Sequence, residues 1–181
     1  MKIKNVFIGL GSNVGDKKST VLAAINKIKD LQDVEIIQVS NNYYSEPWGF
    51  DSEEYFLNCV VELNTNLSPL ELLTFFKTIE YELGRDVKKT KEYQDRTIDI
   101  DILYYSNKIV DQDELRIPHP KISERLFVLK PLFEIAPYFQ DPITLNTMED
   151  LLNNCKDISN IFNEEMYFDD AKFMQNKFKT K

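Results

Sequence analysis

The chain has 181 residues, of which 43% are hydrophobic, and its formal net charge is -8 at pH 7. This size suits one compact domain with at most a short appendage. The acidic excess excludes binding of nucleic acid or of an anionic membrane by bulk charge, so a bound anion must be held by a local basic cluster. No apolar stretch is long enough to span a bilayer, and the N-terminus lacks the features of a signal peptide. Cys59 and Cys155 have no metal-ligand spacing and no disulfide framework, which predicts a cytoplasmic protein with Cys59 as a buried free thiol.

The first third of the chain combines strand patterns with one helix pattern. Its predicted elements are a buried strand at residues 5–10, a helix at 17–32, and strands at 34–44 and 55–65. Val21, Ile25 and Ile28 recur at helical spacing, whereas the strand segments are rich in β-branched and aromatic residues. Pro47 and Gly49 predict a loop before the third strand.

The second helix has the clearest local signals. Ser68 and Glu71 have the spacing of a capping box, and Pro69 occupies the first helical position. Gly84 is the expected C-terminal cap. After a polar loop, residues 98–105 return to a strand pattern.

The predicted order is therefore strand, helix, strand, strand, helix, strand. This order is typical of a ferredoxin-like α+β fold, the βαββαβ sandwich in which helices pack on an antiparallel sheet. Residues 115–140 resemble a loop followed by a short helix, and Thr147 and Asp150 precede two leucines as a helix cap would. We therefore expect a C-terminal helical extension. The residues after it give no clear structural prediction.

Asp99 and Asp101 are the most distinctive candidates for chemistry. They share one face of the predicted strand, while Ile98, Ile100 and Ile102 share the other face and can enter a core. Two carboxylates that lie this close repel each other unless a cation sits between them. Because Mg²⁺ takes a few carboxylates together with water and phosphate oxygens, the pair predicts a magnesium site. The alternative is an acidic strand face exposed to solvent.

Basic residues surround this strand in an otherwise acidic protein. They are Arg85, Lys88, Lys89, Lys91 and Arg96 before it, and His119, Lys121, Arg125 and Lys130 after it. Cations beside a carboxylate pair are what a metal-bound polyphosphate requires. His119, the only histidine, lies between Pro118 and Pro120, which fix the local backbone. A structural histidine in a solvated charged loop is the alternative.

Aromatic residues and an amide come together in the loop at 45–54 and the strand after it. Trp48, Phe50 and Phe56 could stack on a flat heterocycle, and Asn58 could read its hydrogen-bonding edge. A hydrophobic cluster beneath the loop is the alternative. The glycines near the N-terminus match neither a P-loop nor a dinucleotide-binding fingerprint.

Taken together, these segments resemble the family of 6-hydroxymethyl-7,8-dihydropterin pyrophosphokinase, an enzyme of the folate pathway. The segments with this resemblance are, in chain order, residues 9–16, 43–49, 56–58, 79–85, 96–103, 118–120 and 125–132. Arg96-Thr97-Ile98-Asp99-Ile100-Asp101 looks like the family signature. The resemblance covers about residues 5–140 with its motifs in order.

The resemblance implies transfer of a diphosphate from ATP to the hydroxymethyl group of the dihydropterin, with AMP as the second product. It implies that Asp99 and Asp101 hold two Mg²⁺ ions. The residues that would contact the triphosphate are Arg85, Arg96, His119 and Arg125; those that would contact the pterin are Ser45, Pro47, Trp48, Phe56, Asn58 and Phe127. Catalysis would rest on the two aspartates with Arg85 and Arg96. The expected domain covers residues 1–162, followed by a tail of unknown role at 163–181, in a monomer.

The sequence departs from the family pattern at Gln94 and Asp95, which follow the aromatic Tyr93 where the family often has Gly-Pro, and at Lys77, where some members carry glutamine. Two other functions remain open from the residues alone. An RNA-binding module shares the ferredoxin-like order but needs a basic motif that is missing here. A phosphohydrolase or nucleotide-sugar transferase could also use the aspartate pair. No residue is singled out as a general base.

Overall fold

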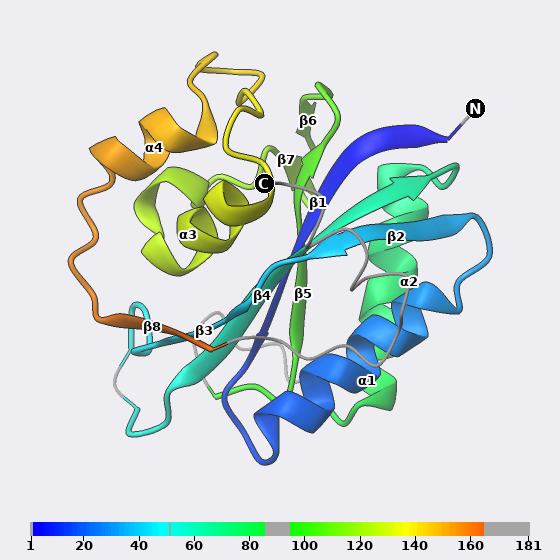
Figure 1. The fold of residues 1–181 in the computed structure, drawn as a ribbon. Coiled ribbons are helices and arrows are strands. Elements are labelled where there is room, and N and C mark those ends of the chain that lie inside the picture. The colour runs from blue at the N-terminus through cyan, green and yellow to red at the C-terminus, as the bar shows by residue number, and fades with distance from the viewer. Residues whose placement is uncertain (1, 51, 86–94, 165–181) are drawn as a thin grey trace, which may run out of the picture.

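The computed structural model describes residues 2–50, 52–85 and 95–164, and residues 1, 51, 86–94 and 165–181 fall outside this description. Its centre is a six-stranded antiparallel sheet with the order β5-β1-β4-β3-β8, and β2 also pairs with β4 (Figure 1). The strands are β1 (Ile3–Ser12), β2 (Val34–Val39), β3 (Asn42–Ser45), β4 (Phe56–Thr65), β5 (Asp99–Tyr105) and β8 (Ile161–Glu164). The predicted α+β fold with helices on an antiparallel sheet is confirmed.

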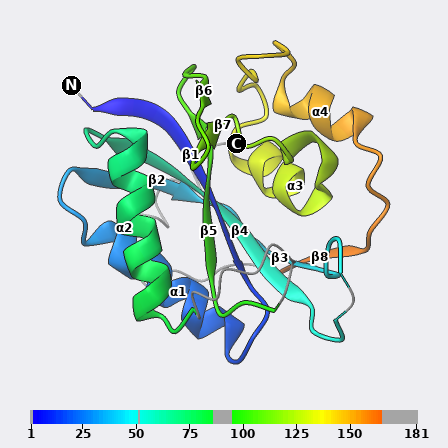
Figure 2. The same cartoon turned by 180° about the vertical axis from the view of Figure 1, so that it is seen from behind.

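Helices α1 (Lys17–Lys29) and α2 (Pro69–Glu82) cover one face of the sheet (Figures 1 and 2). The capping box predicted for α2 is present, since the Ser68 side chain accepts from the Glu71 amide and the Glu71 side chain accepts from the Ser68 amide. Gly84 follows the helix with φ of 86°, a left-handed conformation that glycine adopts without strain.

The opposite face carries α3 (Leu126–Ile135) and α4 (Met148–Asn154), which form the predicted helical extension (Figure 2). Thr147 caps α4 in a reciprocal box with Asp150, as the sequence predicts. In chain order, β5 is followed by a short hairpin, β6 (Val110–Asp111) and β7 (Arg116–Ile117), and by the 3₁₀ turn Ile122–Glu124, which precedes α3. None of the helices in the described ranges has the length and apolarity needed to cross a membrane.

Alternation along the strands divides the core in two. Val6, Ile8 and Leu10 of β1 face α1 and α2, whereas Phe7 faces α3 and α4. In the same way Ile98, Ile100 and Ile102 enter the first core, as predicted, which leaves the aspartates between them for the other face. Cys59 is buried and free, as expected, and Cys155 is also free.

The single strand predicted at 34–44 is wrong, because two strands, β2 and β3, occupy this stretch. The break lies at Ser40 and Asn41. The Ser40 hydroxyl accepts from the Val60 amide at 2.9 Å, and the Glu134 carboxylate accepts from the Asn41 amide at 3.0 and 3.1 Å. Side-chain oxygens thus accept the hydrogen bonds of backbone amides that backbone carbonyls would accept in a continuous strand.

The C-terminal segment adds strand β8, which no sequence pattern predicts. β8 pairs antiparallel with β3, with Ser45 opposite Ile161 and Asn42 opposite Glu164. The predicted boundary between residues 162 and 163 falls within this strand and stays a prediction.

Candidate active site

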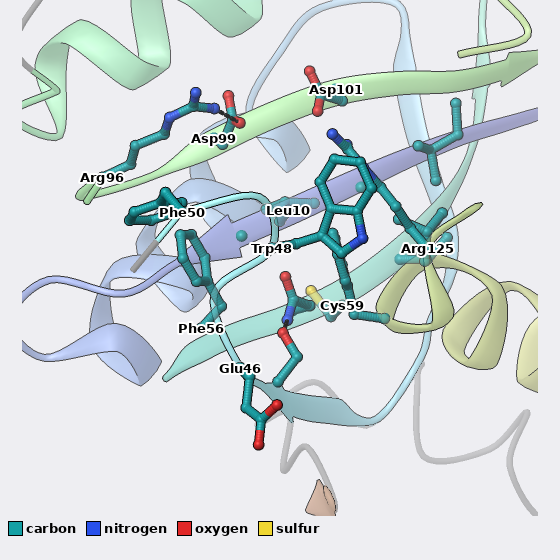
Figure 3. Close-up of a pocket in the computed structure, with 18 residues that line it drawn as sticks. Leu10, Glu46, Trp48, Phe50, Phe56, Cys59, Arg96, Asp99, Asp101 and Arg125 are labelled. Carbon is teal, nitrogen blue, oxygen red and sulfur yellow. Dashed lines mark hydrogen bonds and ion pairs between the residues drawn. The ribbon is translucent and has the colours of Figure 1, made fainter. Parts of the chain in front are cut away.

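A pocket lies on the sheet face opposite α1 and α2, beside the start of α3 (Figure 3). Strands β1, β4 and β5 form its floor, and the loop after β3 and the first turn of α3 form its walls. Its lining comprises Gly9, Leu10, Gly11, Ser45, Glu46, Trp48, Phe50, Phe56, Asn58, Cys59, Val60, Arg96, Asp99, Asp101, Leu103, Arg125, Phe127 and Val128.

Two glycines of β1 form the centre of the floor. Gly11 pairs with Asp99 on one side and with Asn58 on the other, and Gly9 pairs with Asp101. A Cβ atom on Gly11 would lie only 3.2 Å from the Asn58 Oδ1 atom. The absence of side chains here keeps the space between the aspartates and the amide open. These glycines therefore connect the part of the pocket around Asp99 and Asp101, here called the charged half, with the part around Asn58.

Asp99 is held by two arginines. Arg85 Nη1 lies 2.5 Å from Asp99 Oδ1, and Arg96 Nη1 forms an ion pair with Asp99 Oδ2 (Figure 3). All three side chains are about one-fifth exposed, at 20–23%. Burial alone would raise the pKa of Asp99, but Arg96 and Arg85 lower it below its ordinary value.

Asp101 lies in a different environment from Asp99. Its pKa is raised by burial and by the negative charge of Asp99, although His119 and Arg125 act in the opposite direction. Burial in turn lowers the pKa of His119, against the influence of Asp101. Within the described ranges, no group of three or more His, Cys, Asp or Glu side chains is arranged to hold a metal ion. Asp99 and Asp101 are two neighbouring carboxylates of this pocket that could contribute oxygen ligands to a cation.

Glu80 supports the charged half from behind. Its side chain is buried, and its Oε1 atom accepts from the Ile100 amide of β5 at 2.8 Å. The same carboxylate forms ion pairs with Arg85 and with Lys77, the latter at 3.0 Å. Glu80 therefore ties α2, Arg85 and the strand between the two aspartates together. The sequence marked this residue only as part of a motif.

Arg96 is also fixed through its backbone, by a residue more than 80 positions earlier. Asn13 is buried, and its Oδ1 atom accepts from the Arg96 amide at 2.7 Å. The Asn13 amide donates to the Arg96 carbonyl at 3.1 Å, and Asn13 Nδ2 donates to Asp95 at 2.6 Å. The glycine-rich turn at the end of β1 thus anchors an arginine, which the sequence did not reveal.

The other half of the pocket, here called the neutral half, is built around the uncharged side chain of Asn58, with the charged groups of Glu46 and Arg125 in its walls. Asn58 is buried on β4, and its Nδ2 atom donates to the Tyr43 carbonyl at 3.2 Å and to Ser45 Oγ at 2.9 Å. Because both donors of the amide point at β3, its oxygen lies on the side of Gly11. The side chain is therefore oriented to accept a hydrogen bond from a bound group.

Aromatic rings line this neutral half. Trp48 extends across the pocket toward Arg125, whose guanidinium carbon lies 4.6 Å from the indole centroid (Figure 3). The same carbon lies 5.7 Å from the Phe127 ring, and Phe50 meets Phe56 edge to face at 6.1 Å. Flat π surfaces with a neighbouring amide suit a planar heterocycle.

The structure brings most of the predicted residues together. Those that line the pocket are Ser45, Trp48, Phe56, Asn58, Arg96, Asp99, Asp101, Arg125 and Phe127. Arg85 adjoins it through Asp99, and His119 lies near enough to Asp101 for their charges to interact. Pro47 belongs to the wall loop but is not among the lining residues. The candidates Lys88, Lys89 and Lys91, with Tyr93 and Gln94, lie outside the described residues.

Sequence reasoning missed the parts of the lining that carry no distinctive chemistry. These are the strand residues Leu10, Cys59, Val60 and Leu103, and Val128 at the start of α3. Strand alternation from Asp99 and Asp101 could have identified Leu103, which lies on the same face.

A model of the 7,8-dihydro-6-hydroxymethylpterin-pyrophosphokinase (HPPK) family matches residues 7–137. Proteins named 2-amino-4-hydroxy-6-hydroxymethyldihydropteridine pyrophosphokinase are similar: that of Aquifex aeolicus is 42% identical over 76% of this chain and 84% of its own length, and that of Bacillus subtilis is 38% identical over 76% and 81%. The folic acid synthesis protein FOL1 of Dictyostelium discoideum is 42% identical over 86% of this chain, which spans only 24% of that protein.

Among solved structures, Plasmodium falciparum HPPK-DHPS superposes with a TM-score of 0.65 at 16% identity. The match covers 84% of this chain and 45% of the Plasmodium chain. At this identity the likeness shows the fold.

Proposed function

The chain belongs to the HPPK family and is a pyrophosphokinase of folate biosynthesis, and we propose that the pocket described above is where it transfers the diphosphate of ATP to 6-hydroxymethyl-7,8-dihydropterin. The observation that carries this assignment is the position of Gly11. Gly11 lies between Asp99, which is paired with two arginines, and Asn58, the oriented amide among the aromatic rings. A polyphosphate and a flat heterocycle could therefore meet across one open strip of strand.

We assign the pterin to the neutral half. The ring would lie between Phe56 and Phe127, and Asn58 Oδ1 would accept from an N–H group on its edge. Because Asn58 donates to Tyr43 and Ser45, the amide is oriented before the ligand arrives, so little rotamer freedom is lost on binding. Backbone groups between Ser45 and Trp48 can supply further hydrogen bonds.

We assign the ATP phosphates and magnesium to the charged half. Asp99 and Asp101 fit Mg²⁺ because this ion commonly takes one or two carboxylates and completes its shell with water and phosphate oxygens. Their neighbourhood also fits, since burial and mutual repulsion disfavour two negative charges there without a cation. We propose two ions, which would neutralise phosphate charge when bound.

The reaction requires the pterin hydroxyl oxygen to attack the β-phosphorus of ATP. A new O–P bond forms, the bond from the β-phosphorus to the oxygen bridging it to the α-phosphate breaks, AMP leaves with that oxygen, and the hydroxyl proton is released to solvent. Arg85 and Arg96 can donate to phosphate oxygens as charge spreads during transfer, and His119 and Arg125 extend the same cationic rim. The protein thus acts mainly by holding the hydroxyl and the phosphate in line.

Arg85 and Arg96 are both paired with Asp99. To contact phosphate they must release at least part of this carboxylate, which then becomes available to a cation. The exchange replaces one set of ion pairs by another, so the site can accept metal and ATP together without leaving a buried charge uncompensated. A monomeric state and a cytoplasmic location remain predictions.

The test is AMP formation from ATP and Mg²⁺, with and without 6-hydroxymethyl-7,8-dihydropterin, for the wild-type chain and for Asp101→Ala. We expect AMP that depends on pterin and on Mg²⁺, and its loss in the variant. Inorganic phosphate released without pterin would instead indicate a phosphohydrolase. Pterin-dependent AMP that survives in the variant would leave the reaction in place but refute the metal assignment.

A further inference from the structure

The segment from residue 156 to 164, here called the C-terminal strap, follows α4 and lies outside the stretch that the family model matches. It runs from α4 along the α3 side of the molecule and ends as β8 beside β3 (Figure 1). Its side chains and backbone contact both walls of the pocket.

The first contact is with the start of α3. Arg125, the N-cap residue of this helix, makes no side-chain capping bond. Asp157 of the strap supplies one instead, since its Oδ2 atom accepts from the Leu126 amide at 2.9 Å. Leu126 lies between Arg125 and Phe127, both of which line the pocket. A carboxylate at a helix N-terminus also interacts favourably with the helix dipole.

Asp157 is itself fixed within the strap. Its Oδ1 atom accepts from the Ser159 amide at 2.9 Å. Partial burial works against the charged form, yet these two amides lower the pKa of Asp157. The carboxylate is therefore an anchored cap with both oxygens engaged.

The second contact is with the opposite wall. β8 pairs with β3 over its full length, which places Ile161 opposite Ser45. Asn160 Nδ2 donates to Glu46 Oε1 at 3.3 Å. Ser45 accepts the hydrogen bond that orients Asn58, and Glu46 lines the pocket. The strap thus contacts the strand and loop that hold the neutral half.

We propose that the C-terminal strap positions the pterin side of the pocket, with Asp157 and Asn160 as its two positioning residues. This inference rests on the proposed assignment of the pterin to that side. Removing either contact would let one wall move relative to the other, and the pterin lies between the walls. ATP contacts centred on Asp99 and Asp101 would change less, because β8 and β5 lie at opposite edges of the sheet.

The test compares Asp157→Ala and Asn160→Ala with Asp150→Ala. Asp150 is a matched control because it also caps a helix, accepting from the Thr147 amide at 2.9 Å, yet it does not line the pocket. Trp48 is the only tryptophan of the chain, so its fluorescence reports pterin binding in the pocket directly. Melting temperatures are measured alongside.

We expect Asp157→Ala to weaken pterin binding by about three- to five-fold and Asn160→Ala by about two-fold, as for loss of one cap or one exposed hydrogen bond. Asp150→Ala should lower the melting temperature about as much as Asp157→Ala while leaving pterin binding unchanged. Equal pterin affinity in Asp157→Ala and wild type, or an equal loss in Asp150→Ala, would overturn the proposal. If adding pterin changed neither the fluorescence nor the AMP formation of the wild-type protein, the proposed function itself would be overturned.

Discussion

The two halves of the pocket are organised by different forces. In the charged half, ion pairs join Asp99, Arg85, Arg96 and Glu80, and the ATP and magnesium proposed to bind there would have to rearrange them. In the neutral half, Asn58 is fixed by a carbonyl and a hydroxyl that need not move. The charged half is therefore expected to exchange partners when ATP binds, whereas the neutral half is already oriented for its ligand.

The sharpest contrast within the charged half is between its two aspartates. Asp101→Asn and Asp99→Asn should each lower kcat roughly a thousand-fold, because either change removes a carboxylate proposed to hold magnesium. Without metal, Asp101→Asn should raise the free energy of unfolding by about 1 kcal/mol, since it removes a buried charge next to Asp99. Asp99→Asn should lower it by about 1–3 kcal/mol, because Arg85 and Arg96 lose their carboxylate.

Activity and denaturant unfolding of both variants, with and without Mg²⁺, measure these effects. If Asp99→Asn proved as stable as wild type, the arginine pairs would contribute nothing to the unliganded fold. The exchange proposed for ATP binding would then lose its basis.

The neutral half is tested by Asn58→Ala. We expect pterin affinity to fall roughly 10- to 100-fold, because the variant loses the oriented acceptor and leaves the Ser45 hydroxyl without this partner. ATP affinity should stay within about two-fold of wild type, as the change removes no charge. Asn64→Ala, on the same strand but away from the pocket, is the control. Loss of ATP affinity in Asn58→Ala would show that the two halves do not act separately.

Glu80→Gln tests whether the charged half needs its support. The glutamine oxygen can still accept from the Ile100 amide, but the ion pair with Arg85 is lost. We expect kcat to fall about ten-fold, because Arg85 is less firmly positioned, with pterin affinity unchanged. Glu82→Gln, which removes an exposed carboxylate of the same helix, should leave kcat as in wild type. Similar kcat values in both variants would argue that Arg85 needs no second carboxylate.

Much of this arrangement is predictable from local patterns. The alternation of Ile98, Asp99, Ile100 and Asp101 fixes which side chains leave the core, and it holds in the structure. The capping box at Ser68 likewise predicts the start of α2 to the residue. Signals of this kind depend on neighbours within one strand or one helical turn.

The missed features depend on contacts between distant parts of the chain. Asn13 holds Arg96 across 83 positions, and Asp157 caps a helix that begins 31 positions earlier. The break at Ser40 results from Val60 and Glu134, which no local pattern places nearby. Such contacts form only when distant strands and helices assemble. They therefore produce no repeating pattern of residue types from which a single sequence could predict them.

The smallest expected effect comes from Tyr43→Phe, behind the neutral half. The Tyr43 hydroxyl donates to Glu134 at 2.9 Å, whereas the pocket depends on the Tyr43 carbonyl, which the variant retains. We therefore expect a loss of about 1 kcal/mol in the free energy of unfolding and less than a two-fold change in pterin affinity.

Burial and Glu134 raise the pKa of Tyr43 above 10.0, so its hydroxyl favours folding at neutral pH and this contribution fades as the pH rises above 10. The stability difference between wild type and variant should shrink over that range. Tyr104→Phe, which removes a comparable bond to Asp141 away from the pocket, is the control. Weaker pterin binding in Tyr43→Phe, but not in Tyr104→Phe, would mean that pterin binding in the neutral half also depends on the charge of Glu134. The distinction between a charged and a neutral half would then no longer hold.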